Sequence, residues 1–178
     1  MRGILCFLSG ESVALHEEYL AQLCLRRSAL EKSEPRLSGA SLADLARLPI
    51  GKDMRAEAAG LLGEIEAHEL YFASFDEKHA FCPALRKYYG SENGFLYAVL
   101  TAAKEAAKRG SAFLAVGLDR AGKIAFADGT GASAMLAVRP VFALDLCEHA
   151  YFTDYRFDKD KYLFRAVSYL NLRKCADF

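Results

Sequence analysis

The sequence predicts an α+β fold, in which an N-terminal antiparallel helical hairpin is followed by a small antiparallel β-sheet flanked by helices. Two observations support this prediction. In the first half, apolar residues recur at helical spacing on both sides of a Pro- and Gly-containing stretch at residues 34–39. From about residue 112, short apolar segments separated by turn residues replace that pattern. Helices first and a sheet second are typical of an α+β chain.

Two long helices are expected in the first half. The first spans residues 11 to about 32, with Ser9 as its cap. Its apolar positions are Leu15, Tyr19, Leu20, Leu23 and Leu30. The second spans residues 53 to about 75, with Asp53 as its cap. Proline and glycine between them disfavour a continuous helix, so we expect the two to form a hairpin.

The second half is expected to begin with an alanine-rich helix at residues 92–109, which Gly110 ends as a C-terminal cap. Strands are expected at residues 112–118 and 123–127. The four residues 119–122 between them, Asp-Arg-Ala-Gly, are typical of a hairpin turn.

Two further strands are expected at residues 134–138 and 140–144, and a last helix at residues 158–172. The inward-facing residues of that helix are predicted to be Tyr162, Phe164, Val167 and Leu170. The chain is thus expected to form two subdomains, a helical hairpin at residues 1–80 and an α/β part at residues 81–178.

The composition excludes several classes of protein. Of the 178 residues, 53% are hydrophobic, which is enough for a substantial core. The 23 basic and 23 acidic residues cancel, which argues against binding to nucleic acid or to a membrane surface. No segment has the roughly 20 apolar residues of a membrane span. The five cysteines are scattered and show no Cys-x-x-Cys pairing, so we expect a cytoplasmic protein with reduced thiols.

The most informative segment for function is residues 143–155, Ala-Leu-Asp-Leu-Cys-Glu-His-Ala-Tyr-Phe-Thr-Asp-Tyr. It places Asp145 and His149 four residues apart, just after an apolar, strand-like run that starts at Pro140. A hard carboxylate oxygen beside an imidazole nitrogen suits a redox-active first-row metal such as iron or manganese. The segment resembles the Asp-x-Trp-Glu-His-Ala-Tyr signature of the iron/manganese superoxide dismutases.

Four other segments extend the resemblance along nearly the whole chain. Residues 8–16 resemble the family's Ile-Ser-x-Glu-Thr-Ile-x-x-His, and residues 68–72 its His-x-x-Phe/Tyr-Trp. Residues 41–45 resemble the Ser-Leu-Glu-Glu-Leu turn of the helical hairpin, and residues 110–113 stand where the family has Gly-Ser-Gly-Trp. The order and spacing of these segments match the family.

The resemblance implies that one iron or manganese ion per chain is bound between the two halves by His16, His68, Asp145 and His149. Three imidazoles and one carboxylate leave one coordination position for water or substrate, as in catalytic metal sites. The implied substrate is superoxide, which is converted to oxygen and hydrogen peroxide. Taken singly, a helical histidine is more often structural, and Asp145 can cap the following turn. His79 lies outside the family pattern, in a polar loop, and is expected to be solvated.

Several positions depart from the family. Cys24 stands where the family has a tyrosine that guards the substrate funnel. Leu20 replaces a histidine, and Phe152 replaces the tyrosine that meets that histidine from the partner subunit, so two hydrogen-bonding partners become apolar together. The chain has no tryptophan, and the positions of the family's tryptophans are taken by Phe72, Phe113 and Cys147.

Glu64 and Cys24 are the candidate catalytic residues. Glu64 lies one helical turn before His68 on the same helix face, where iron members of the family carry a glutamine that donates a hydrogen bond to metal-bound solvent. An ionised glutamate cannot donate this hydrogen bond, whereas a protonated one can. Manganese members carry this glutamine in the sheet region, near Thr130 here, so the sequence leaves the choice of metal open. The alternatives are that Glu64 turns to solvent and that Cys24 is a buried, inert helical residue.

The expected function is superoxide dismutation by an antioxidant oxidoreductase. One alternative is a divergent, metal-binding dimeric relative with weak or no dismutase activity. Another is a dimerisation or partner-binding protein in which any metal only joins the two halves. The retained ligand positions favour the first two.

The resemblance also implies a homodimer formed through Glu148 and Tyr151. In the family, the glutamate at this position reaches across the dimer to the ligand histidine of the other subunit, which would orient His149. The alternatives are that Glu148 is an exposed turn residue and that Tyr151 is a core aromatic.

Overall fold

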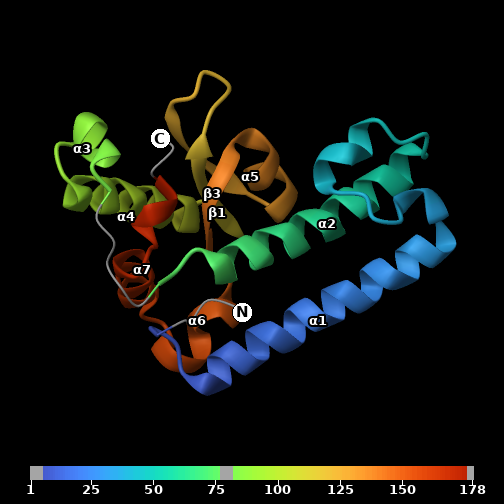
Figure 1. The fold of residues 1–178 in the computed structure, drawn as a ribbon. Helices are drawn as coiled ribbons and strands as arrows, with labels where there is room; N and C mark the ends of the chain where they lie inside the picture. The colour runs from blue at the N-terminus through green and yellow to red at the C-terminus, as the bar shows by residue number, and fades with distance from the viewer. Residues whose placement is uncertain (1–5, 77–81, 176–178) are drawn as a thin grey trace.

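The computed structural model describes residues 6–76 and 82–175, and its first half is the predicted helical hairpin (Figure 1). Helix α1 (Gly10–Ser33) and helix α2 (Lys52–Ala73) run antiparallel to each other. Two 3-10 turns connect them, η1 (Pro35–Leu37) and η2 (Leu42–Ala46). The N-terminal half of the predicted α+β fold is therefore confirmed.

The starts of the two long helices follow different local chemistry. Ser9 caps α1 as predicted, because its side chain accepts the backbone N–H of Ser12 at 3.2 Å. Helix α2 begins one residue earlier than expected and has Gly51 as its cap, so the prediction of Asp53 as the cap is wrong. Asp53 lies in the first turn, where its negative charge still interacts favourably with the helix dipole.

The predicted sheet consists of three antiparallel strands in the order β2-β1-β3. Their bounds are Phe113–Leu118 for β1, Ile124–Gly129 for β2 and Arg139–Asp145 for β3. Every residue of the central strand β1 is buried. The predicted turn between β1 and β2 is confirmed: Gly122 has φ +74°, and the Asp119 carboxylate accepts the backbone N–H groups of Ala121 and Lys123.

Helices precede and follow the strands of the sheet in the sequence. Helix α4 (Glu92–Lys108) confirms the predicted alanine-rich helix, and Gly110 follows it with φ +76°, the left-handed conformation expected after a helix end. The short helices α3 (Ala84–Tyr89) and α6 (Glu148–Tyr155) were not predicted. Helix α6 carries the second half of the segment that resembles the family signature.

The predicted strand at residues 134–138 is wrong, because this segment belongs to helix α5 (Gly131–Ala137). Thr130 caps the helix by accepting the N–H of Ser133, and its alanine, methionine and leucine residues have high helix propensity. A short apolar run of this kind does not distinguish a strand from a buried helix by periodicity.

The last predicted helix is shorter than expected and divided. Helix α7 (Lys159–Ser168) is followed by the 3-10 turn η3 (Leu172–Cys175). Between them the chain pairs with the end of α2, since Leu170 forms an antiparallel bridge with Phe75. Tyr162, Val167 and Leu170 are buried as predicted, whereas Phe164 is 59% exposed, so its predicted inward orientation is wrong.

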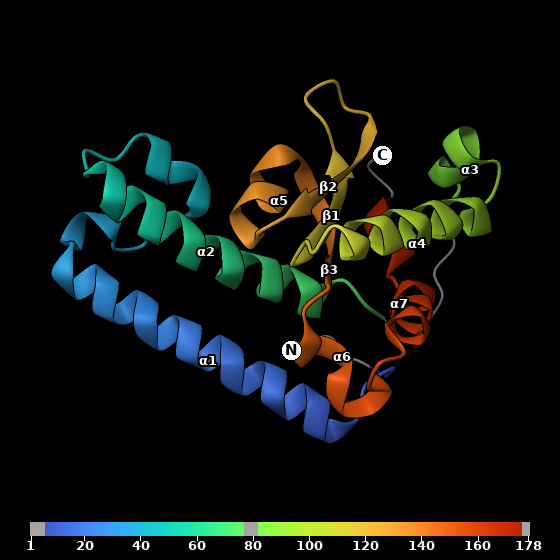
Figure 2. The same ribbon diagram turned by 180° about the vertical axis from the view of Figure 1, so that it is seen from behind.

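Helix α2 lies between α1 and the sheet, as both views show (Figure 2). It contacts α1 on one side and both α5 and β3 on the other. One hydrophobic cluster includes Leu20 of α1, Tyr71 of α2, Phe142 of β3 and Tyr162 of α7. The two halves of the chain therefore share a core.

The predicted boundary between subdomains, at residue 80, falls outside the described residues, and the division into subdomains stays a prediction. His79 also lies outside the described residues. Among residues 6–76 and 82–175, no helix is both long and apolar enough to span a membrane.

Helices α2 and α5 are in contact through two glycines. A Cβ atom at Gly63 would lie 2.3 Å from the backbone nitrogen of Ala132, and one at Gly131 would lie 2.4 Å from the carbonyl oxygen of Gly63. These separations are closer than atoms can approach without a backbone shift. The two glycines therefore allow the helix backbones to meet directly.

We predict that Gly63→Ala lowers the free energy of unfolding by about 1–3 kcal/mol, because the new methyl group meets backbone atoms. Gly60 is the matched control: it lies in the same helix, and a Cβ there meets no atom within 4 Å. Gly60→Ala should raise the unfolding free energy by up to about 1 kcal/mol. Urea unfolding of both variants measures the difference, and equal effects would contradict a tight contact between α2 and α5.

Candidate metal centre

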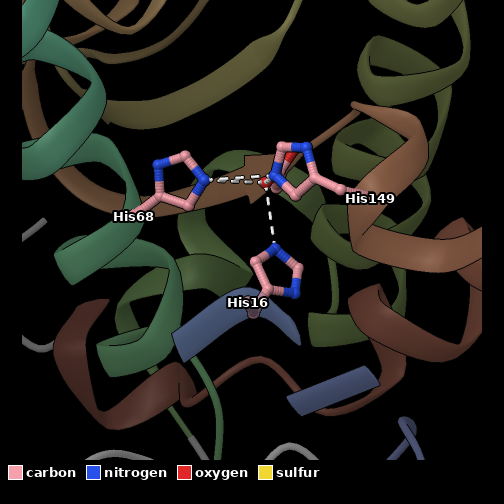
Figure 3. A group of neighbouring side chains, drawn as sticks. His16, His68 and His149 are labelled. Atoms are coloured by element: carbon pink, nitrogen blue, oxygen red, sulfur yellow. Dashed lines mark hydrogen bonds and ion pairs between the residues drawn. The ribbon is translucent and has the colours of Figure 1, made fainter. Parts of the chain in front are cut away.

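Four side chains that are distant in sequence converge between the hairpin and the sheet. His16 comes from α1, His68 from α2, Asp145 from the end of β3 and His149 from the first turn of α6. Figure 3 shows the three imidazole rings turned toward one point. One potential ligand atom from each of the four residues lies within 4.8 Å of the others. The structure thus brings together the four residues that the sequence predicts as metal ligands.

The centre of this group is one carboxylate oxygen. Asp145 Oδ2 lies 2.9 Å from His149 Nε2, 3.1 Å from His16 Nε2 and 3.3 Å from His68 Nε2. The Nε2 atoms of His68 and His149 are also only 3.2 Å apart. Ligand atoms bound about 2.1 Å from a common ion lie roughly 3 to 4 Å from one another. The separations are therefore close to those that a shared metal ion requires.

The hydrogen-bonding groups of the histidines fit a metal better than a network of hydrogen bonds. His68 Nδ1 lies 2.7 Å from the backbone carbonyl oxygen of Glu64, which can only accept, so Nδ1 carries a proton. In the neutral imidazole, Nε2 then presents a lone pair to Asp145 and His149. That lone pair faces the Asp145 carboxylate oxygen at 3.3 Å, and neither atom has a proton to share with the other. A cation among the four groups removes this conflict.

The group is largely removed from solvent. His16, His68 and Asp145 are buried, and only the His149 side chain is partly open, with 31% of its surface exposed. Burial alone would raise the pKa of Asp145, but the surrounding imidazoles of His149, His16 and His68 hold that pKa well below its usual range. Burial likewise opposes protonation of His68, yet the Asp145 carboxylate outweighs it and raises the His68 pKa. The site therefore favours a carboxylate anion surrounded by groups that stabilise negative charge.

Other residues fix the position of Asp145. Its second carboxylate oxygen accepts the backbone N–H of Cys147 at 2.8 Å, so Asp145 also caps the following turn. Its carbonyl oxygen accepts the hydroxyl of Tyr162 at 2.8 Å. The Tyr162 oxygen lies 3.2 Å from that of Tyr71, and because its own proton goes to Asp145, Tyr71 is the donor in that pair. Strand β3 is thus joined to α7 and α2 at the residue that carries the carboxylate.

Aromatic rings surround the histidines where the family has tryptophans. The Phe72 ring packs edge-on to His16 with centroids 5.7 Å apart, and the Phe113 ring packs edge-on to His68 at 5.1 Å. Tyr71 stacks on the other side of His16 at 5.1 Å. These contacts restrict the rotation of the two imidazoles and keep water away from them.

Tyr19 and Glu64 form a polar pair beside the centre. The Tyr19 hydroxyl donates to Glu64 Oε2 at 3.1 Å, and its ring lies 4.7 Å from the His149 ring and 5.3 Å from the His68 ring. Burial, followed by the nearby Glu64 carboxylate, raises the Tyr19 pKa to about 12, so the phenol stays protonated at neutral pH. In the sequence Tyr19 fits the apolar helix pattern and was not predicted as a site residue, although its spacing of three residues from His16 places both on one helix face.

Two cysteines, Cys24 and Cys147, lie in different surroundings. Cys24 is exposed on α1, and the structure does not bring it to the four converging residues, so its predicted catalytic role stays a prediction. Cys147 is close to them, but burial raises its pKa to about 12, and its thiol donates weakly to the carbonyl oxygen of Ala112. At neutral pH it is a neutral thiol rather than a thiolate.

A pocket of about 500 Å³ opens beside the centre, between α1 and α6. Its wall includes Leu15, Tyr19, Glu148, His149 and Phe152. The partly exposed edge of His149 is thus the part of the four-residue group that faces this pocket.

Comparison with known proteins agrees with the geometry. The family model for iron/manganese superoxide dismutases, C-terminal domain, matches residues 77–177, which is more than half of the chain. No curated protein gives a significant match. Together with the α+β fold and the buried group of three histidines and one aspartate, this match shows that the chain belongs to the iron/manganese superoxide dismutase family.

Proposed function

We propose that the protein converts superoxide to oxygen and hydrogen peroxide at one iron or manganese ion per chain. The observation that supports this most directly is the convergence of three imidazole Nε2 atoms on one carboxylate oxygen, in a chain of this family. Imidazole nitrogen with one carboxylate oxygen is a donor set that suits redox-active first-row metals. The proposed ligands are His16, His68, Asp145 and His149.

The chemistry that a bound iron or manganese ion would supply is one-electron exchange, so that one superoxide leaves as oxygen and a second takes up two protons and leaves as hydrogen peroxide. The residues of the chain would hold and tune such an ion. The Glu64 carbonyl fixes the tautomer and orientation of His68, and Tyr162 with Cys147 fixes Asp145. The Phe72 and Phe113 rings exclude bulk water from the ligands.

The alternative is a metal-binding relative with weak or no dismutase activity. It is favoured by Glu64, because an ionised carboxylate accepts the hydrogen bond of the Tyr19 hydroxyl and cannot itself donate one toward the ligands. A negative charge at this position also favours the oxidised form of a metal and so unbalances the two half-reactions. Metal content and superoxide consumption, measured on one sample from the native host, separate the two functions.

We predict that His68→Ala and Asp145→Ala each abolish stoichiometric metal binding, since both remove a buried ligand. The exposed neighbour Glu69 provides the control, and Glu69→Ala should keep one metal per chain. Elemental analysis of the three variants gives the metal content. Because metal binds only the folded state, its loss should also lower the unfolding free energy, by about 4 kcal/mol if the free metal is at a thousand times its Kd.

Full metal retention in both His68→Ala and Asp145→Ala would contradict the assignment of the ligands. Retained metal with no superoxide consumption by the wild-type protein would favour the alternative function.

A second prediction concerns the support of Asp145. Tyr162→Phe leaves the buried carbonyl of Asp145 and the hydroxyl of Tyr71 without their partner, and should lower the unfolding free energy by about 1–3 kcal/mol. Tyr97 is a suitable control because its side chain is exposed on α4. Tyr97→Phe should change the unfolding free energy by no more than about 0.5 kcal/mol. A similarly small effect at both positions would show that the Tyr162 hydroxyl does not hold Asp145.

We also propose that the protein is a homodimer formed through the surface around the pocket. Three exposed side chains there are apolar: Leu15 and Phe152 line the pocket, and the Phe157 ring, 92% exposed, contacts Phe152 edge-on at 5.6 Å. Exposed apolar clusters of this kind mark interaction sites. Glu148 is exposed beside them and could reach a second copy, whereas Tyr151 is largely buried and stacks on Tyr162.

We therefore predict a two-fold dimer that Glu148→Ala weakens and Phe152→Asp disrupts, with a rise in the dimer Kd of about thirtyfold or more for the latter. Phe164→Asp is the control, because Phe164 is also an exposed phenylalanine, 59% against 37% for Phe152, but lies on α7, outside this pocket. Light scattering across a concentration series measures the Kd. A wild-type monomer at micromolar concentration would refute the dimer. A cytoplasmic location stays a prediction.

A further inference from the structure

One side chain connects the pocket with the buried ligands. Tyr19 lines the pocket wall, and its ring also contacts the rings of both His68 and His149. His68 itself is buried and does not line the pocket. A small molecule that moves from the pocket toward the ligands therefore passes the Tyr19 ring and the exposed edge of His149.

A hydrogen bond to α2 holds the Tyr19 side chain in this position. Its hydroxyl donates to Glu64 Oε2 at 3.1 Å, and Glu64 lies on α2, one turn before His68. The hydrogen bond therefore joins α1 to α2 at a residue that lines the pocket. It also keeps the Glu64 carboxylate, which is half-buried, in contact with a proton donor.

The charge of this pair matters for an anion. A carboxylate that is partly removed from water repels an approaching anion more strongly than one in bulk solvent, because the effective dielectric is lower. The phenol proton offsets part of that negative charge, as hydrogen bonds to a charged group do. Without the hydroxyl, the full carboxylate charge would act on an anion near His149.

We propose that Tyr19 is a gating and positioning residue, and that its hydrogen bond to Glu64 sets the affinity of the metal centre for small anions. The proposal rests on the metal site of the proposed function. On this proposal, the α1 side chain that an entering anion meets is Tyr19, three positions after His16, rather than the exposed Cys24.

The test is a double-mutant cycle on the full-length protein loaded with cobalt(II). Cobalt(II) absorbs visible light, and the measurement does not depend on superoxide turnover. Azide, a small monoanion, is titrated, and its Kd is read from the change in the cobalt spectrum. Tyr19→Phe should raise the azide Kd about five- to tenfold, the size of the net contribution of a typical hydrogen bond. Glu64→Gln should lower it, because the repelling charge is gone.

The decisive comparison is the effect of Tyr19→Phe in the Glu64→Gln background. With no carboxylate to neutralise, loss of the hydroxyl should change the azide Kd less than about twofold. Glu18 provides a matched charge control, since it is exposed on the same pocket wall but is not the partner of Tyr19. Glu18→Gln should leave the five- to tenfold effect of Tyr19→Phe intact.

An equal effect of Tyr19→Phe in the wild-type and Glu64→Gln backgrounds would overturn the proposal, as would an unchanged azide Kd in Tyr19→Phe or no azide binding by the cobalt-loaded wild type. Failure of the wild-type protein to bind cobalt would instead contradict the metal site on which the proposed function rests. Thermal unfolding of each metal-free variant verifies that it is folded, and both key substitutions keep the shape of the side chain.

Discussion

The position of the buried Asp145 carboxylate is the constraint on which the other features of the site depend. A buried charge costs several kcal/mol unless it is paired and hydrogen bonded. Here the partners come from separate elements, because His16, His68 and His149 lie on α1, α2 and α6, while Tyr162 reaches the same residue from α7. Each of these helices must dock correctly for the charge to be satisfied. The geometry of the candidate metal centre and the packing of the two halves therefore depend on each other.

The contact between α2 and α5 contributes to that docking. Gly63 and Gly131 let the two helix backbones touch, which fixes how closely α2 approaches the C-terminal half. His68 lies five residues after Gly63 on the same helix, so the position of α2 against α5 also sets the separation between the His68 imidazole and the end of β3. A displacement of about 1 Å at such a position is enough to impair a catalytic geometry.

The sequence was informative where local physics decides the structure, and less so where tertiary contacts decide. The periodicity of apolar residues predicted α1, α2 and α4. The cap at Ser9 and the end of α4 before Gly110 follow from backbone chemistry. The α5 segment was mistaken for a strand because its short apolar run fits both structures, and its packing against Gly63 has no local signal. The convergence of the ligands could be expected only from the family resemblance, since each helical histidine alone has a structural alternative.

Tyr19 was missed because an aromatic residue in a helical pattern normally packs in a core, yet it explains how Glu64 is tolerated. A half-buried carboxylate beside the proposed metal ligands needs a hydrogen-bond donor, and Tyr19 supplies it from the facing helix. The opposite change occurs at Leu20, which is buried, and Phe152, where two positions that hydrogen bond in the family are both apolar. At Leu20 and Phe152 the two partners are apolar together, because changing one alone would leave a polar group without its partner. At Tyr19 and Glu64 the two partners are polar together, for the same physical reason.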